Sequence, residues 1–151
     1  YGLLPALGTS WVAVGEIDWR VLWVAFPVAL LVDAILHANN TRDAKTDSKA
    51  NIRTMAMGMG VQASVVLYVL EQLIPFIWVV ALIPFHIFPW LSILVTFVMR
   101  FAIRNTRAMR EFKETGNVAE IADLDQRSAQ TQMLFAIVLC ISFLVDLLLL
   151  R

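Results

Sequence analysis

Charged residues and cysteines are scarce in this chain of 151 residues, and each scarcity excludes a class of protein. Asp, Glu, Lys and Arg make up 16% of the residues, hydrophobic residues make up 60%, and the mean hydropathy is +0.74. A soluble domain carries about 25% charged residues, so the composition predicts a protein whose solvent is the lipid bilayer. The single cysteine, Cys140, lies in an apolar run, which excludes a disulfide or a zinc site built from cysteines of this chain.

The chain also lacks an excess of charge of either sign, which excludes nucleic acid as a partner. Its formal net charge is zero, and it has no basic tail and no interleaving of aromatic and basic residues. Nucleic-acid-binding surfaces are typically basic. A signal peptide is not predicted, because Tyr1 opens into an apolar stretch without a positively charged segment before it. We expect a processed chain or a part of a longer product.

Long apolar runs, in contrast, recur along the whole sequence. A bilayer core of about 30 Å needs roughly 20 apolar residues per helix. The sequence predicts a partial span and four further spans, which cover residues 1–15, 19–38, 61–83, 88–103 and 126–150. The link Ile83 to His86 is too short for anything but a tight turn, so its flanking spans are antiparallel neighbours. The predicted fold is all-α, an integral membrane helical bundle of about five transmembrane helices over residues 1–151.

Polar residues gather in two segments, a predicted polar loop at 39–60 and a basic stretch at 100–127. Two predicted spans separate the segments, so both lie on the same side of the membrane. The positive-inside rule makes that side cytoplasmic, or stromal or matrix in an organelle. We therefore expect a multi-pass protein of a bacterial inner membrane or an organellar membrane.

The polar loop contains a pattern that suits metal and phosphate binding. If the second span continues past the membrane surface as a helix, Asn39, Asp43 and Asp47 fall along one stripe. Lys49 and Arg53 then form a cationic pair just beyond. Magnesium is typically held by one or two carboxylates together with substrate phosphates. From spacing alone, however, an ordinary solvated helix end is the favoured interpretation.

A family resemblance changes this balance. The run from Leu36 to Ala56 resembles the second aspartate-rich motif of the UbiA superfamily, most closely the pattern NNxRDxxxDxxxGxxTLA of its dihydroxynaphthoate (menaquinone and phylloquinone) branch. The positions that match are Asn39, Asn40, Arg42, Asp43, Asp47, Thr54 and Ala56. A weaker similarity is Gln126-Arg127-Ser128-Ala129, which is similar to the Q-R-T-A that opens the last helix in that branch. By this resemblance the chain is the C-terminal half of the nine-helix UbiA fold.

The resemblance implies a function and a role for each matching residue. It implies transfer of an isoprenyl group from a prenyl diphosphate to an aromatic quinone precursor, through an allylic carbocation. Asp43 and Asp47 would be the catalytic residues that hold Mg2+. The residues implied to bind the diphosphate are Asn39, Asn40, Arg42, Lys49 and Arg53.

The sequence departs from the family pattern in several places. Asn51 replaces the motif glycine, and we expect it to adopt the left-handed backbone that glycine would supply. Lys45 replaces an acidic residue between the two aspartates, where it could pair with Asp43 or Asp47 and compete with the metal; Ser48 stands at a commonly basic position. The first family motif, NDxxDxxxD, is absent. These departures favour a second hypothesis, a non-catalytic UbiA-derived structural or lipid-binding subunit of a membrane complex.

Polar residues within the predicted spans give further expectations, because such residues are costly in lipid unless they are paired or functional. We expect a hydrogen bond between Asp33 and His37, or alternatively a proton acceptor near the aromatic substrate. Glu71 is expected to cap the backbone groups that Pro75 frees, or to pair with another chain. We also expect further transmembrane helices or subunits to cover the face that carries Asp33 and Asp43.

Overall fold

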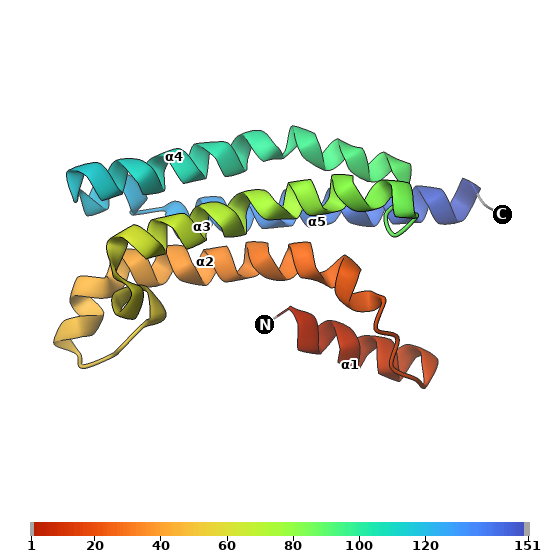
Figure 1. Ribbon diagram of the computed structural model, residues 1–151, viewed down its shortest axis with the longest axis horizontal. Helices are drawn as coiled ribbons and strands as arrows, with labels where there is room; N and C mark the ends of the chain where they lie inside the picture. The colour runs from red at the N-terminus through yellow and green to blue at the C-terminus, as the bar shows by residue number, and fades with distance from the viewer. Residues whose placement is uncertain (1, 150–151) are drawn as a thin grey trace.

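The computed structural model describes residues 2–149, which form helices and no strand (Figure 1). In chain order the elements are α1 (Leu3–Val14), α2 (Val21–Lys49), α3 (Met55–Leu82), the 3-10 helices η1 (Ile83–Phe85) and η2 (Trp90–Phe97), α4 (Met99–Thr115), the 3-10 helix η3 (Val118–Ile121) and α5 (Leu124–Leu149). The all-α prediction is therefore confirmed. The predicted end of the last span, Leu150, lies outside the described residues.

Three helical segments are long and apolar enough to cross a membrane: 21–49, 55–85 and 118–149. They agree with three of the predicted spans, and α1, with 12 residues, agrees with the predicted partial span. The predicted fourth span at 88–103 differs. Its apolar part, η2, is a 3-10 helix, and the α-helix that begins at Met99 carries a cation at every third or fourth position. No single helix there combines sufficient length with sufficient apolarity.

Helices α2, α3 and α5 run side by side, and the η2–α4 segment lies along α3 and α5 (Figure 1). Near the apolar end, Phe76 of α3 meets Phe135 of α5 edge-on, with their ring centroids 5.2 Å apart. Towards the polar end, Ala34 and Ala38 of α2 pack in a cluster with Tyr68 of α3. Such small residues let helix backbones approach closely in a membrane protein.

The polar segment 39–60 is mostly helix rather than the predicted loop. Helix α2 runs unbroken to Lys49, and a short turn joins it to α3. Asn51 in that turn has a φ of 58°, so the expected left-handed backbone is confirmed. Thr54 caps α3 by accepting a hydrogen bond from the backbone N–H of Met57. Gly60 kinks α3 with φ 77° and ψ 162°, a conformation essentially confined to glycine.

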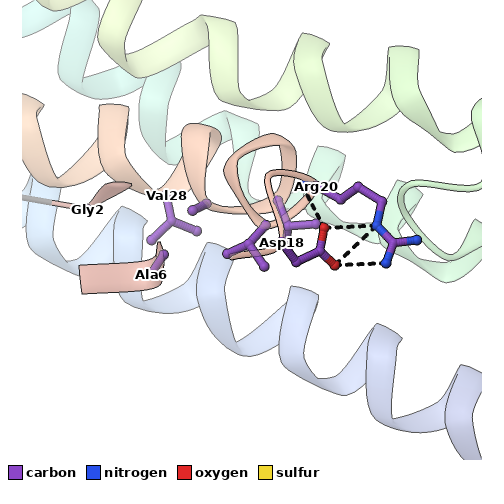
Figure 2. Close-up of a pocket in the computed structure, with 8 residues that line it drawn as sticks. Gly2, Ala6, Asp18, Arg20 and Val28 are labelled. Carbon is purple, nitrogen blue, oxygen red and sulfur yellow. Dashed lines mark hydrogen bonds and ion pairs between the residues drawn. The ribbon is translucent and has the colours of Figure 1, made fainter. Parts of the chain in front are cut away.

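Helix α1 folds back along α2, and the two enclose a cavity of about 510 Å³ that is lined mainly by apolar residues (Figure 2). Gly2 allows the close approach, since a Cβ there would lie 2.5 Å from the Cβ of Ala29. At the turn, Arg20 binds both carboxylate oxygens of Asp18. These hydrogen bonds hold the pKa of Asp18 below its usual range and fix the sharp link between the two helices.

Candidate functional site

The aspartate stripe lies on one continuous helix. Asn39, Asp43 and Asp47 follow one another at intervals of four residues within α2, so successive members turn by only about 40°. The Asp43 side chain is 39% exposed, and Asp33, nearly three turns earlier, is exposed as well. The stripe therefore lies on a side of α2 that the described helices leave at least partly open.

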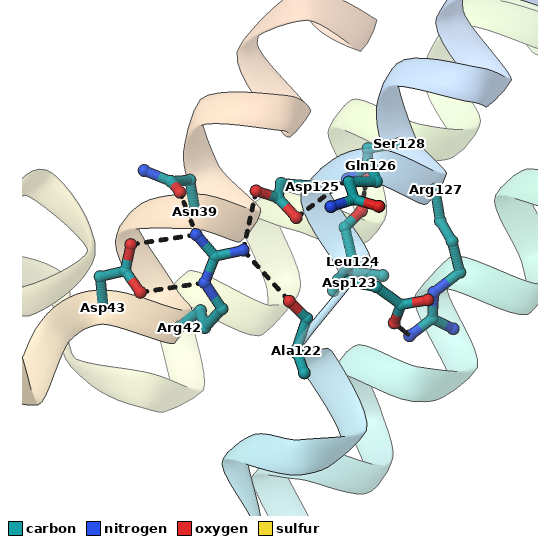
Figure 3. Close-up of polar contacts among 10 residues, drawn as sticks. All are labelled: Asn39, Arg42, Asp43, Ala122, Asp123, Leu124, Asp125, Gln126, Arg127 and Ser128. Atoms are coloured by element: carbon teal, nitrogen blue, oxygen red, sulfur yellow. Dashed lines mark hydrogen bonds and ion pairs between the residues drawn. The ribbon is translucent and has the colours of Figure 1, made fainter.

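Arg42 holds this stripe against the start of α5 (Figure 3). Its Nε and Nη2 donate to the two carboxylate oxygens of Asp43 at 2.9 and 3.1 Å, and Nη2 also donates to Asn39. Its Nη1 contacts the carboxylate of Asp125 at 2.7 Å and donates to the carbonyl of Ala122 at 3.2 Å. The two polar segments therefore meet at one end of the bundle, as the charge pattern predicts.

These contacts give Arg42 a structural role. Four hydrogen bonds and the ion pair with Asp125 engage all three guanidinium nitrogens. The diphosphate role that the family resemblance assigns to Arg42 stays a prediction. Its observed role is positional, because it orients Asp43 and Asn39 and joins α2 to α5.

Lys45 does not compete for the aspartates. It lies about 200° around the helix from both Asp43 and Asp47. Among residues 2–149, no ion pair links Lys45 to either of them. Lys45 instead lines a cavity between α2 and α3. The expectation that this lysine could pair with an aspartate of the motif is therefore wrong.

The other predicted site residues lie near the stripe without closing a site. Asn40 and Asp47 are half-buried on α2, whereas Lys49 and Arg53 are exposed at its end and in the turn that follows. Within the described part of the chain, no group of three or more His, Cys, Asp or Glu side chains converges as a metal site. The stripe offers two carboxylates and one amide oxygen, and further ligands have to come from a bound phosphate, water or another helix.

Sequence reasoning missed a buried polar cluster on the other side of α2. His37 Nδ1 lies 3.0 Å from Glu71 Oε2, and His37 Nε2 lies 2.7 Å from Ser64 Oγ. Their side chains come from α2 and α3 and are almost fully buried. Two polar residues in neighbouring spans were the available signal, but spacing cannot select partners 34 positions apart.

This cluster corrects two expectations. His37 bonds to Glu71 rather than to Asp33, which is exposed. Glu71 does not cap the backbone near Pro75, because its carboxylate is engaged by His37. An apolar interior forces these two groups together, since neither has another way to satisfy its hydrogen bonds there.

The start of α5 connects to the same region. Tyr68 of α3 shares a hydrogen bond with Ser128 at 2.7 Å, and Arg127 binds Asp123 at 2.6 Å (Figure 3). The Gln-Arg-Ser-Ala segment therefore fixes the polar ends of α3 and α5 relative to each other. The Gln-Arg-Ser-Ala segment therefore positions Asp125 for its contact with Arg42 and does not itself supply ligands to the site.

Long apolar helices with a carboxylate-bearing face at one end define this protein as a helical membrane protein with a polar site at the end of the bundle. A model of the UbiA prenyltransferase family matches residues 1–120, and the chain belongs to this family. No solved structure matches the chain significantly.

Curated relatives agree with this assignment. The chain is 41% identical to a UbiA prenyltransferase domain-containing protein 1 homolog of Drosophila melanogaster over 76 residues, which cover 50% of the chain and 21% of that protein. It is 30% identical to the human UbiA prenyltransferase domain-containing protein 1 over 91% of the chain and 38% of that protein. It is 28% identical to the 1,4-dihydroxy-2-naphthoate octaprenyltransferase of Bacillus subtilis over 96% of the chain and 46% of that protein. The chain thus spans less than half the length of these relatives.

Proposed function

We propose that this chain contributes the second aspartate face of an enzyme that transfers an isoprenyl group from a prenyl diphosphate to an aromatic quinone precursor, with the help of Mg2+. Membership of the UbiA prenyltransferase family supports prenyl transfer in general. The likeness to the Bacillus subtilis naphthoate enzyme supports a dihydroxynaphthoate acceptor. The observation that carries the proposal is the open stripe on α2, where Asp43 and Asp47 lie one turn apart on a single helix.

The residues of the stripe fit a magnesium ion. Asp43 uses one contact on each carboxylate oxygen for Arg42, which leaves further lone pairs on both oxygens. Asp47 is half-buried, and no hydrogen bond to its side chain is formed within residues 2–149. Asp43 and Asp47 would hold the ion, whose charge would make the diphosphate a better leaving group.

The surrounding residues prepare this face for a diphosphate. Arg42 keeps Asp43 oriented through a bidentate contact, which is the strongest geometry for a guanidinium and a carboxylate. Lys49 and Arg53, both exposed beyond the stripe, would bind phosphate oxygens that the metal leaves free. The apolar helices below would hold the prenyl chain, and the side with the cations would face the cytoplasm or its organellar equivalent.

Further transmembrane helices complete the proposed site. Asp33 is exposed on the apolar part of α2, at a depth where an uncovered carboxylate is costly. We propose that neighbouring helices, which carry the other aspartate motif, cover the face with Asp33 and Asp43. Crosslinking from a photoreactive residue at Leu36, which is exposed on the same side, would detect those helices in native membranes.

The test of the activity is a substitution in the stripe, made in the full gene product and assayed in native membranes. Asp47→Asn should lower Mg2+-dependent prenylation of dihydroxynaphthoate by at least ~100-fold, because a carboxylate ligand is lost. The matched control is Glu16→Gln, which neutralises an exposed carboxylate in the turn before α2, away from the stripe. Unchanged activity in Asp47→Asn would refute the proposed site.

A second candidate function is a non-catalytic subunit derived from this family. It is favoured by one observation, namely that all three guanidinium nitrogens of Arg42 make contacts within the chain. In that case the unsubstituted protein would itself show no prenyl transfer in native membranes, while the crosslinks from Leu36 would still form. The two assays together therefore separate the two functions.

A further inference from the structure

A second cavity lies on the side of α2 opposite the aspartate stripe. It has a volume of about 200 Å³ and lies between α2, α3, α4 and η3. Its polar lining residues are Lys45, Thr41, Ser64 and Arg42, whose guanidinium is engaged by Asp43 and Asp125. The remaining wall is mainly apolar, with Met57, Val61 and Phe112. Lys45 is exposed, whereas Thr41 and Ser64 are buried, so the cavity has a cationic mouth and a hydroxyl floor.

The protons on the floor can be assigned by following the hydrogen bonds. Thr41 Oγ1 donates its only proton to the carbonyl of His37 at 2.8 Å. Ser64 Oγ lies 3.2 Å from Thr41 Oγ1 and 2.7 Å from His37 Nε2, and its single proton can go to only one of them. In either case, both hydroxyl protons are used within the protein.

The pair of His37 and Glu71 lies beneath the floor and is buried. The side chains of His37 and Glu71 are 3% and 2% exposed, and no Lys or Arg pairs with Glu71 among the described residues. The chemistry of the floor does not depend on the protonation of this pair. If Nε2 carries a proton, it donates to Ser64 and Ser64 donates to Thr41; if Nε2 carries none, Ser64 donates to Nε2.

Neither hydroxyl therefore keeps a proton for a ligand, because Thr41 donates to the backbone and Ser64 donates either to Thr41 or to His37 Nε2. Each floor hydroxyl donates its proton within the protein and retains a free lone pair. The floor can therefore accept hydrogen bonds from a ligand but cannot donate them.

We infer that this cavity binds a small amphipathic hydroxy acid, with its carboxylate at Lys45 and its hydroxyl donating to Thr41 or Ser64. The two ends of the cavity call for opposite groups, because Lys45 supplies positive charge and donors and the floor supplies acceptors. Thr41 and Lys45 are one helical turn apart, so the two groups of the ligand lie about 6 Å or more apart. A cavity of about 150 Å³ can hold benzene, so the apolar body has about six carbons. The site does not depend on the proposed prenyl transfer.

Binding can be tested with 6-hydroxyhexanoate and the chain in lipid nanodiscs, by saturation-transfer NMR with empty nanodiscs subtracted. Hexanoate, which lacks the donor, should bind about 5-fold more weakly, as expected for one hydrogen bond. The diol 1,6-hexanediol, which lacks the anion, should bind at least ~10-fold more weakly. Equal binding of all three compounds, or no binding of any, would overturn the inference.

Variants sharpen the test. Lys45→Met should weaken binding of 6-hydroxyhexanoate at least ~10-fold and leave 1,6-hexanediol unaffected. Lys49→Met, one turn further and outside the cavity lining, is the control and should change neither. Thr41→Val should weaken 6-hydroxyhexanoate and not hexanoate. If these variants fold poorly, the comparison of the three compounds on the unsubstituted chain decides the matter, because tighter binding of hexanoate than of 6-hydroxyhexanoate would contradict an accepting floor.

Discussion

Both sides of α2 carry polar groups at its polar end, but these groups are partly exposed on one side and buried on the other. On the stripe side, Asp43 and Asp47 are partly exposed and keep ligand capacity, and Arg42 fixes one of them from the edge. On the α3 side, His37 is buried and its ring nitrogens are both engaged by the protein. The comparison teaches that one helix can separate buried structural polar contacts from accessible ones within about a third of a turn.

The largest expected loss of stability comes from a substitution on the buried side of α2. Glu71→Leu removes one partner of the buried pair and leaves His37 Nδ1 without an acceptor or donor, so the free energy of unfolding should fall by about 3–5 kcal/mol. Glu71→Gln keeps hydrogen-bonding atoms and should cost less. The measurement is thermal or denaturant unfolding in detergent, with Asp47→Asn as the stripe-side control. Equal stability of Glu71→Leu and Asp47→Asn would contradict the distinction between the two sides.

The second effect concerns the kink that forms one wall of the cavity. Gly60→Ala forces a side chain into a backbone conformation that only glycine adopts readily, although the space around it is open. The free energy of unfolding should fall by about 1–3 kcal/mol. Gly58→Ala, at a helical position with equally open space, should be neutral or stabilising. A destabilised Gly58→Ala with a neutral Gly60→Ala would show that the kink is not as described.

Arg42 gives a third, smaller effect at the boundary between the two sides. Arg42→Lys retains the charge but cannot reproduce five N–H contacts, so the start of α5 should loosen and stability should fall by about 1 kcal/mol after allowance for partial exposure. Hydrogen exchange at residues 122–127 is the readout. Unchanged protection there would mean that Arg42 does not hold α5 against α2.

The smallest effect lies in the turn that ends α2. Asn51→Gly restores the residue of the family pattern at a position with φ 58°. Glycine adopts this left-handed backbone conformation without strain. Stability should change by less than about 0.5 kcal/mol. Asn51→Val, which is branched at Cβ, should be clearly destabilising by comparison. Equal melting temperatures for the glycine and valine variants would argue against the left-handed turn.

Local geometry was the part of this molecule that sequence reasoning could predict. The stripe of Asp43 and Asp47, the left-handed Asn51 and the apolar helices follow from helix pitch, residue type and apolar length. These depend on neighbours in the chain. The predicted loop at 39–60 is helical because α2 continues through its polar end, which hydropathy alone cannot show.

Contacts between helices could not be predicted in the same way. The His37–Glu71 pair, the engagement of Arg42 by Asp125 and the direction of Lys45 into a cavity depend on which helix faces overlap. A spacing of four residues made Asp33 a plausible partner of His37, but burial selected Glu71 instead. The magnesium and diphosphate roles of the stripe remain predictions, since they rest on groups from outside the described chain.

The unbroken length of α2 has a mechanical consequence. With 29 residues and a rise of about 1.5 Å each, the helix is about 43 Å long, so it exceeds a hydrocarbon core of about 30 Å by two turns or more. A helix of this kind acts as a ruler that holds the carboxylates at a constant height above the lipid. The prenyl chain would have to reach that height, so a single inserted residue before Asn39 would both raise the carboxylates by about 1.5 Å and rotate them by about 100° away from their open face.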